Sequence, residues 1–378
     1  MTICLACRSS RTKVLADLGT TPVLNGVMFD DRASARAATL GRLDLAVCLD
    51  CGHVFNVAYD PGLLDYDAEY DNSLHFSPTF QAYADELAHR LVDTYDLHNG
   101  LIVEIGSGKG DFLESITALS GSRGVGYDPS TMSEREIPNV TLVSDYYRPG
   151  QGVEPYDLLV CRHVLEHLER PEEILLSLRQ TAPADAIHYF EVPAAEFDFG
   201  PDGLWDFIYP HVSYFSTESL YTLVMRCGFD IIASGRSFSD QFHWVEVRAG
   251  AGDAPVADPG AHLAALADFA ERRERTVSRS RSELSDRNRR GQITALWGAG
   301  ARGVAFLNAV DPDAILLVVD LNPRKWGRYL PGTGHEVIPP EALASSSVTQ
   351  VLITNPAYEI EISEHLQRLG IHASVSRV

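Results

Sequence analysis

The stretch LIVEIGSGKGDFL, residues 101–113, decides the fold of this chain. An apolar run that contains one acidic residue predicts a buried strand, and the three glycines that follow at alternate positions break it. Glycines allow the backbone to pass close to a ligand, and a helix that begins directly after them presents free N–H groups. The stretch therefore predicts a strand, a turn and a helix that bind a nucleotide-type cofactor.

The turn reads E-x-G-x-G-x-G, which differs from the dinucleotide pattern G-x-G-x-x-G and lacks the lysine and hydroxyl of a P-loop. It resembles the first motif of class I S-adenosylmethionine methyltransferases. In such folds the second strand ends in an acid that binds the ribose hydroxyls, and GVGYDPS supplies one. LVSDYY then offers an acid and an aromatic ring for the adenine. The residues predicted to bind S-adenosylmethionine in these stretches are Glu104, Gly106, Gly108, Gly110, Asp128, Pro129, Asp145 and Tyr146.

Composition excludes several classes of protein. The length of 378 residues and the hydrophobic content of 45% fit a globular protein of about two or three domains. The formal net charge of -21 argues against nucleic acid as the main ligand, because its backbone requires clustered Lys and Arg. The sequence contains no apolar run of the roughly 18–20 residues that span a bilayer, and MTICLACRSSRTK lacks a secretory signal. We therefore expect a cytoplasmic protein with a small-molecule substrate and no membrane partner; the sequence leaves the oligomeric state open, and a monomer is compatible with it.

Two C-x2-C knuckles, CLAC and CLDC, predict a metal site near the N-terminus. Their cysteines are Cys4, Cys7, Cys48 and Cys51. Each knuckle offers two thiolates to one tetrahedral zinc ion, and four thiolates leave no position open for a catalytic water. The prediction is a structural zinc; the alternative is four buried free cysteines.

The C-terminal third of the sequence repeats the order of a strand, a glycine turn and a helix. An arginine-rich stretch, ERRERTVSRSRSELSDRNRRG, precedes it, and because acidic residues alternate with the basic ones we predict a solvated linking helix rather than a nucleic-acid site. ITALWGAGARGVAFLNAV, ILLVVDLNPRKWGRYLPG and VTQVLITNPAYEIEI then predict a second, smaller α/β unit. Its glycines form G-x-G-x-x-G, which by itself suggests a dinucleotide site; a simple packing turn is the alternative.

The order of these parts resembles the three-module sugar C-methyltransferases of deoxysugar biosynthesis. The resemblance rests on CLAC, CLDC, VEIGSGKGDFL, VCRHVLEHL, FEVP, IYPHVSYFS, WGAGARG and VVDLNPRKWGRYLPGTG. It implies an α/β chain with a zinc-binding domain at 1–70, a class I methyltransferase domain of Rossmann-like fold at 71–250, a helical linker at 251–290 and a Rossmann-like C-terminal domain at 291–378. It also implies S-adenosylmethionine as the methyl donor and a nucleotide-linked keto-sugar as the substrate, in deoxysugar or antibiotic biosynthesis.

The resemblance further implies catalytic residues. A carbon next to a ketone becomes nucleophilic when a base removes its proton, and histidine suits this task near neutral pH. His211 and Tyr209 match the family's segment, and Tyr214 and His163, at the expected mouth of the sheet, are further catalytic candidates. The family carries a glutamate beside the last histidine of this segment, where this chain has Pro210. Proline supplies no carboxylate and no backbone donor.

Other polar residues at the mouth of the predicted sheet could compensate, among them Glu166 and His167. For His167 we expect a structural role, and for His163 a structural role is the alternative to one in the site. The departure at position 210 keeps other chemistry open: a proton-transfer rearrangement such as epimerisation or cyclisation, or methylation of oxygen or nitrogen. A protein that only senses S-adenosylmethionine and a dinucleotide-dependent oxidoreductase are further alternatives.

Two segments complete the predicted site. YDAEYDNSLHFSPTF, residues 66–80, could fold over the cofactor as a lid, with Tyr70 and Ser73 on the donor or the sugar; a linker packed on the zinc domain is the alternative. The resemblance implies that the C-terminal glycine turn and NPRKWGRYLPG approach the nucleotide or its diphosphate, as a helix N-terminus and a lysine would. The residues predicted to bind the substrate there are Gly298, Gly300, Arg302, Lys325 and Tyr329.

Overall fold

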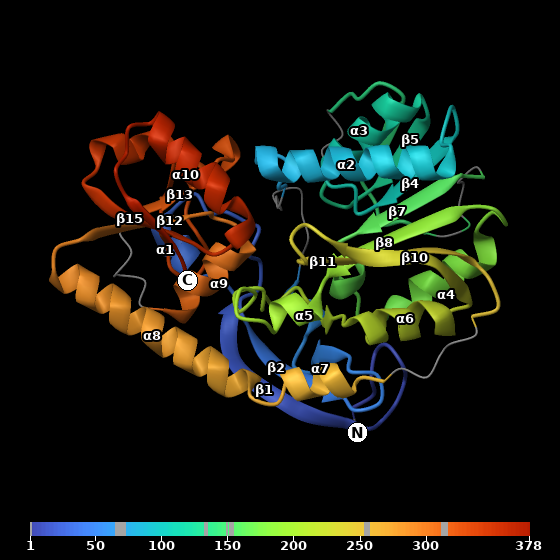
Figure 1. Ribbon diagram of the computed structural model, residues 1–378, viewed down its shortest axis with the longest axis horizontal. Helices are drawn as coiled ribbons and strands as arrows, with labels where there is room; N and C mark the ends of the chain where they lie inside the picture. Colours follow the sequence, from blue (N-terminus) through green and yellow to red (C-terminus); the bar gives the residue numbers. More distant parts are fainter. Residues whose placement is uncertain are drawn as a thin grey trace.

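The structure is a computed structural model that describes residues 2–64, 73–131, 135–148, 150, 155–252, 258–310 and 317–378. Three β-sheets and their helices build the described chain (Figure 1). None of the helices in these ranges is long and apolar enough to cross a membrane.

The central sheet has seven strands in the order β10-β11-β8-β7-β4-β5-β6. The strands are β4 (Leu101–Ile105), β5 (Arg123–Tyr127), β6 (Val140–Val143), β7 (Leu158–Arg162), β8 (Ile187–Pro193), β10 (Phe229–Ser237) and β11 (Phe242–Ala249). Strands β4 to β8 are parallel, whereas β11 runs antiparallel to both β8 and β10. The predicted class I Rossmann-like fold, with its strand and glycine turn at the centre of the sheet, is confirmed.

Helices cover both faces of the central sheet. Helices α2 (Pro78–Tyr95) and α3 (Asp111–Ser120) lie on one face, and α4 (Pro171–Thr181), α5 (Ala195–Asp198) and α6 (Thr217–Arg226) on the other (Figure 1). Every residue of β4 is buried: Val103 packs in the core beneath α4 and α6, and Ile102 in the core beneath α2 and α3. Burial on two faces explains why this strand reads as an apolar run rather than an alternating one.

Helix α2 shows how local signals set an element. Ser77 caps its first turn, because the Ser77 hydroxyl accepts from the backbone N–H of Phe80, and proline occupies the next position. Phe80, Leu87 and Leu91 are buried, and their spacings of seven and four residues place them on one face of the helix. The helix ends at Tyr95, followed by Asp96 in the left-handed conformation.

The N-terminal sheet has four antiparallel strands in the order β1-β2-β3-β9. They are β1 (Thr12–Pro22), β2 (Leu40–Cys48), β3 (Val54–Asn56) and β9 (Ser213–Tyr214). Strand β9 lies within the predicted catalytic segment IYPHVSYFS, so that segment is tied to the N-terminal sheet. Between β1 and β2, helix α1 (Arg32–Arg36) reaches the C-terminal unit, where Gly332 donates to the Ala35 carbonyl.

The C-terminal sheet is parallel throughout, in the order β14-β13-β12-β15-β16. Its elements are β12 (Ile293–Trp297), α9 (Ala301–Ala309), β13 (Leu317–Val319), β14 (Val337–Ile338), β15 (Val348–Ile353), α10 (Glu359–Arg368) and β16 (Ser374–Arg377). Short 3-10 turns connect elements at η1 (Pro61–Leu63), η2 (Leu165–His167), η4 (Pro323–Lys325), η5 (Pro340–Ser345) and η6 (Pro356–Tyr358). This second α/β unit is the one that the sequence predicts.

Helix α8 (Phe269–Arg289), preceded by α7 (Gly260–Ala265), links the N-terminal sheet to the C-terminal sheet (Figure 1). It buries Phe269, Val277 and Leu284 on one face. Arg275 pairs with Glu271 one turn away, as the alternation of charge predicts. The domain boundaries given above stay predictions, since α1 and β9 both pair across them.

Candidate active site

A cavity of about 740 Å³ lies between the carboxyl edge of the central sheet and that of the C-terminal sheet. Open α/β sheets bind their ligands at this edge. The predicted site residues that line it are Ser73, Glu104, Gly106, Gly108, Asp128, Pro129, Tyr146, His163, His211, Gly298, Gly300, Arg302 and Lys325. Gly110, Asp145, Tyr209, Tyr214 and Tyr329 do not line it, and Tyr70 lies outside the described residues.

The glycine turn after β4 is tied to the acid at the end of β5. Asp128 Oδ2 accepts from the backbone N–H of Gly108 at 3.0 Å, and Asp128 Oδ1 accepts from that of Ser130 at 2.7 Å. Gly106 adopts a φ of +75°, and a Cβ there would lie 2.3 Å from Val164 Cγ2. The turn therefore requires glycine, and it fixes the Asp128 carboxylate at the mouth of the cavity.

Of the two residues predicted to bind the adenine, Tyr146 lines the cavity and Asp145 does not. The Asp145 carboxylate forms an ion pair with Arg148 at 2.6 Å. Tyr146 lines the cavity with a largely exposed ring, and the neighbouring Tyr147, which the sequence analysis did not select, lines it with a buried ring packed against Tyr127. Aromatic rings thus stand where the adenine face is expected.

Arg162, the last residue of β7, is a cavity residue that the sequence analysis missed. Its side chain is buried, and its guanidinium lies 4.2 Å from the centre of the Phe112 ring. Within the described chain, its Nε and Nη1 atoms have no hydrogen-bond partner. A charged residue at the end of an apolar strand was the signal that could have found it.

Glu104, in β4, lies beneath the glycine turn and is buried. Burial raises its pKa to about 7, although the Arg162 charge opposes the shift. The side chain lines the cavity from below the donor turn.

His163 bridges two buried carboxylates. Its Nε2 lies 3.4 Å from Glu191 Oε1, and its Nδ1 lies 3.7 Å from Glu166 Oε1. Burial opposes the charged imidazole, but the two carboxylates outweigh this effect and raise the pKa of His163 to about 9. The backbone of His163 has a φ of +55°, which is uncommon for a residue with a Cβ. His163 is therefore a cation in the cavity wall at neutral pH.

Glu191, on β8, is the anchor of this arrangement. Its carboxylate accepts from the hydroxyls of Tyr83 and Tyr189, and from Ser237 at 3.3 Å. Burial alone would raise the pKa of Glu191, yet the hydrogen bonds and the charges of His163 and Arg162 lower it to about 2. The residue is the acid of FEVP, whose place at the end of an apolar strand was the available signal.

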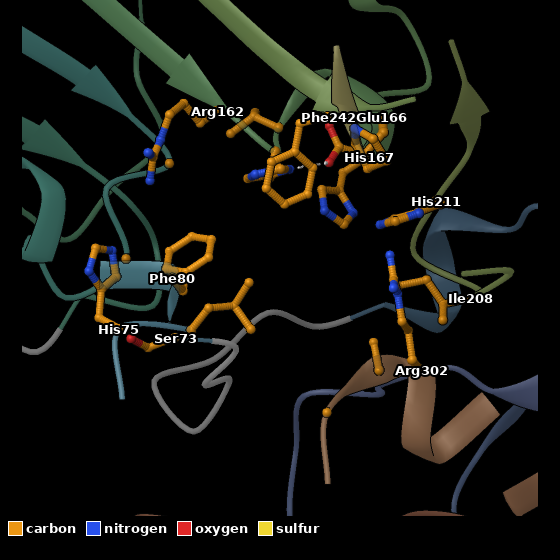
Figure 2. Close-up of a pocket in the computed structure, with 18 of the residues that line it drawn as sticks. Ser73, His75, Phe80, Arg162, Glu166, His167, Ile208, His211, Phe242 and Arg302 are labelled. Carbon is orange, nitrogen blue, oxygen red and sulfur yellow. Dashed lines mark ion pairs between the residues drawn. The ribbon is translucent and has the colours of Figure 1, made fainter. Parts of the chain in front are cut away.

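His167 and His211 meet at the far wall of the cavity. The ring centres lie 5.0 Å apart, with the planes at 70°. His167 Nδ1 donates to the Pro210 carbonyl at 2.9 Å, since a carbonyl only accepts. Figure 2 shows the two rings next to each other, with Arg302 pointing toward His211 from helix α9. Burial, with the help of His167, lowers the pKa of His211 to about 3, so its ring is neutral at neutral pH.

Tyr209 and Tyr214, the other residues predicted from this segment, lie outside the cavity and anchor the segment to the N-terminal region. The Tyr209 hydroxyl accepts from the backbone N–H of Asp60 at 2.8 Å and donates to its carbonyl at 3.2 Å. Tyr214 pairs with Val54 in the N-terminal sheet, and its ring is buried among apolar residues. The structure therefore brings His163, but neither tyrosine, to the cavity wall with His211.

The C-terminal glycine turn faces the same cavity. Asp320, at the end of β13, accepts from the backbone N–H of Ala299 at 2.7 Å and pairs with Lys325 Nζ at 3.3 Å. Arg302 Nε donates to Asp206 at 2.6 Å, which connects α9 to the central domain. Tyr329 lies away from the cavity, where its backbone pairs with that of Phe29.

The four knuckle cysteines converge. The Sγ atoms of Cys4 and Cys51 are 3.6 Å apart, and those of Cys7 and Cys48 are 3.5 Å apart. A tetrahedral ion with Zn–S bonds of about 2.3 Å separates its sulfurs by roughly 3.8 Å, so the cluster fits zinc. All four atoms lie within 4.8 Å of one another, and none of these cysteines lines the cavity.

Comparison with known proteins agrees with this geometry. Residues 76–234 match the family model described as a methyltransferase domain, and residues 259–373 match the one described as a C-methyltransferase C-terminal domain. The C-methyltransferase NovU of Streptomyces niveus is 25% identical over 398 residues, which cover 96% of this chain and 91% of NovU.

Two solved structures are among the similar ones. A putative S-adenosylmethionine-dependent methyltransferase from Listeria monocytogenes has a TM-score of 0.36 at 11% identity, over 45% of this chain and 99% of that one. Human N-acetylserotonin methyltransferase in complex with S-adenosylmethionine has a TM-score of 0.36 at 14% identity, over 45% and 55%. The chain is an S-adenosylmethionine-dependent methyltransferase, and its C-terminal region is similar to that of C-methyltransferases.

Proposed function

We propose that the enzyme transfers a methyl group to the carbon next to the ketone of a nucleotide-linked sugar. One observation carries the proposal: a single cavity joins the glycine turn of the methyltransferase domain, a cluster of three histidines, and the glycine turn of a region similar to C-methyltransferases. NovU, which matches nearly the whole chain, is described as a C-methyltransferase. Deoxysugar or antibiotic biosynthesis, as the resemblance implies, is the setting that we propose.

The donor end of the cavity has the groups that S-adenosylmethionine needs. Asp128 suits the ribose hydroxyls, and Tyr146 and Tyr147 suit the adenine face. Arg162 is a buried cation whose Nε and Nη1 atoms find no hydrogen-bond partner among the described residues, which suits the carboxylate of the methionine part. When bound, S-adenosylmethionine supplies an electrophilic methyl group.

The middle of the cavity has a proton acceptor and a nearby cation. His211 is neutral and lines the cavity, so it can accept the proton from the carbon next to the ketone. His163 is charged, so its positive charge can stabilise the oxygen that becomes negative as this proton leaves. A proton acceptor and a nearby cation are what enolate formation requires.

The C-terminal end of the cavity suits the nucleotide and its diphosphate. The Gly298 and Gly300 turn leads into helix α9, whose first N–H groups face the cavity edge. Lys325 lines the same end, although its ammonium already pairs with Asp320. This pairing gives Lys325 an orienting role for the turn beside its contact with a ligand.

The N-terminal cluster is proposed to hold one structural zinc ion through its four thiolates. The backbone N–H groups of Cys7 and Asp50 point at the Sγ atoms of Cys4 and Cys48, each at 3.4 Å, which stabilises thiolates in a metal knuckle. A reducing compartment such as the cytoplasm, as predicted from the sequence, would keep these thiols available to the ion.

Product analysis tests the proposed function. The enzyme is incubated with S-adenosylmethionine labelled with 13C in its methyl group and with a panel of nucleotide-linked 4-keto-6-deoxyhexoses. We expect a product heavier by one CH2, with the label bonded to a carbon next to the carbonyl. Label on oxygen or nitrogen would contradict C-methylation, and an isomerised product of unchanged mass would contradict methyl transfer. Asp128→Asn, which weakens donor binding, is the matched control for adventitious transfer.

A further inference from the structure

The structure offers a carboxylate close to His211 although Pro210 occupies the neighbouring position in the chain. Glu166 belongs to the 3-10 turn η2 and is 1% exposed. One ligand atom each of Glu166, His167 and His211 lies within 4.8 Å of the others. Figure 2 shows Glu166 beside His167, with His211 across from it. The carboxylate therefore reaches the imidazole through space rather than along the chain.

Two backbone contacts fix the distance between this turn and the His211 segment. The N–H of Val212 donates to the Glu166 carbonyl at 2.8 Å. On the other side of His211, His167 Nδ1 donates to the Pro210 carbonyl at 2.9 Å. These two bonds flank His211 and hold its segment against η2. Pro210 is thus part of the support, because its carbonyl is the acceptor.

The Glu166 carboxylate has capacity for another positive partner. In the described part of the chain, neither of its oxygens accepts a hydrogen bond, and its ion pair with His163 is long, at 3.7 Å. His163 also pairs with Glu191, whose carboxylate is closer to the ring, at 3.4 Å. A buried carboxylate is costly unless it is paired and hydrogen-bonded. A proton arriving on His211 would supply such a partner.

The charges around His211 make this partner important for the reaction. The groups that act electrostatically on His211 are Glu166 and His167 from η2, His163 from the end of β7 and Arg302 from α9. His163, His167 and Arg302 all oppose a positive charge on His211, and of these four groups only Glu166 favours it. Proton uptake by His211 therefore depends on the Glu166 charge.

We propose that Glu166 is the positioning carboxylate of proton transfer, which orients His211 and stabilises the imidazolium that forms when His211 takes the substrate proton. This inference rests on the proposed function. The C–H bond next to the ketone breaks, its proton moves to His211, and its electron pair forms the enolate. The enolate carbon then bonds to the methyl carbon while the sulfur keeps the electrons of the broken S–C bond. His211 finally releases its proton to solvent.

The test separates proton transfer from methyl transfer. Wild type, Glu166→Gln and Glu166→Asp are compared for kcat and KM, and for solvent deuterium uptake next to the ketone in the presence of S-adenosylhomocysteine. Glu173→Gln is the matched control, because Glu173 is an exposed glutamate of α4 that pairs with Arg170 outside the cavity. We expect Glu166→Gln to lower kcat and deuterium uptake together, by roughly 100-fold, with little change in either KM. Glu166→Asp should recover part of both rates, since it restores the charge.

Several outcomes decide the proposal. Glu166→Gln with wild-type kcat and wild-type exchange would overturn it while leaving the proposed function intact. Wild type that transfers no methyl to carbon and exchanges no deuterium would overturn both. Dependence of wild-type turnover on an added divalent cation, lost in Glu166→Gln, would overturn it in favour of a metal site at Glu166, His167 and His211. Thermal unfolding and donor titration show whether Glu166→Gln is folded. If it is not, Glu166→Ala is measured with and without formate, and we expect formate to restore deuterium exchange. A folded Glu166→Ala enzyme whose exchange does not change with formate would overturn the proposal.

Discussion

At the scale of single residues, the cavity histidines His163 and His211 differ because their neighbours differ. His163 lies between two carboxylates and is charged at neutral pH, whereas His211 faces other cations and is neutral. Two identical side chains thereby become a cation and a neutral proton acceptor in one cavity. This division of roles predicts how activity depends on pH.

The charged form of His163 should be needed for turnover. Its pKa is raised to about 9, so the charge is present below that value and is lost as pH rises through it. We expect kcat/KM to be level from pH 7 to 8 and to fall above about 9, in a profile measured with enzyme shown to be folded at each pH. The His163→Gln variant should have a low kcat/KM at neutral pH, and its kcat/KM should not fall further above pH 9. An unchanged kcat/KM at pH 10 in wild type would contradict the assignment.

We expect buried His188, which lies outside the cavity, to make the free energy of unfolding sensitive to acid. Burial lowers its pKa to about 4, and its Nε2 meets the Tyr156 hydroxyl at 3.0 Å. The unfolded chain binds this proton near pH 6.5, so the stability is present above that pH and is lost as pH falls toward 4. We expect wild type to lose roughly 1–3 kcal/mol of unfolding free energy over that window beyond what His188→Gln loses, measured by urea denaturation. Parallel loss in both proteins would refute the role of His188.

Local patterns predicted the residues whose partners lie nearby along the chain. The glycine turn and the cysteine knuckles follow from spacing, and Asp128 follows from the place where such folds carry an acid. Asp145 stays a prediction, since its carboxylate pairs with Arg148 and does not line the cavity. Glu191 and Arg162 were missed, because their importance depends on burial beside His163 and Phe112 rather than on any motif.

At the scale of elements, the turn after β4 has little freedom to change. Gly106→Ala places a Cβ 2.3 Å from Val164 Cγ2 in a left-handed backbone. We expect the variant to lose roughly 1–3 kcal/mol of stability and to bind S-adenosylhomocysteine at least tenfold more weakly, by calorimetric titration. Gly300→Ala is the control, since a Cβ there meets nothing within 4 Å and the residue lies in the other turn. Wild-type donor affinity in Gly106→Ala would contradict the described turn.

Strand β9 explains why the catalytic segment could not be fully predicted. Its two residues extend the N-terminal sheet by pairing with β3, a partner far away in the sequence. That pairing turns Tyr214 into the core, and the bonds to Asp60 anchor Tyr209. Periodicity over ten residues shows neither contact, because both are set by tertiary structure.

At the scale of the whole molecule, the two halves of the cavity are joined by side-chain pairs. Gln241 and Asn355 exchange two hydrogen bonds, at 3.0 and 2.9 Å. Glu361 of α10 accepts from the Ser77 hydroxyl at 2.6 Å and from the backbone N–H of Thr79 at 3.0 Å, at the start of α2. The wall proposed for the donor and the wall proposed for the nucleotide are therefore connected on the cavity side.

The proposed zinc site should influence the active site through the N-terminal sheet. Cys48 ends β2, and the sheet continues through β3 to β9 beside His211. We expect one zinc per chain by elemental analysis, and we expect Cys48→Ser to lower the Tm by about 5 °C or more and to reduce kcat. Cys227→Ser is the control, because Cys227 is a buried cysteine outside the cluster. Metal-free wild type with unchanged Tm would contradict a structural zinc.

The most direct test of the account is the position of the transferred carbon. The enzyme is supplied with 13C-methyl S-adenosylmethionine and a nucleotide-linked 4-keto-6-deoxyhexose, and the product is studied by two-dimensional NMR. The account predicts a labelled methyl that couples to a ring carbon next to the carbonyl. A labelled methyl on oxygen or nitrogen, or a product without label, would contradict it.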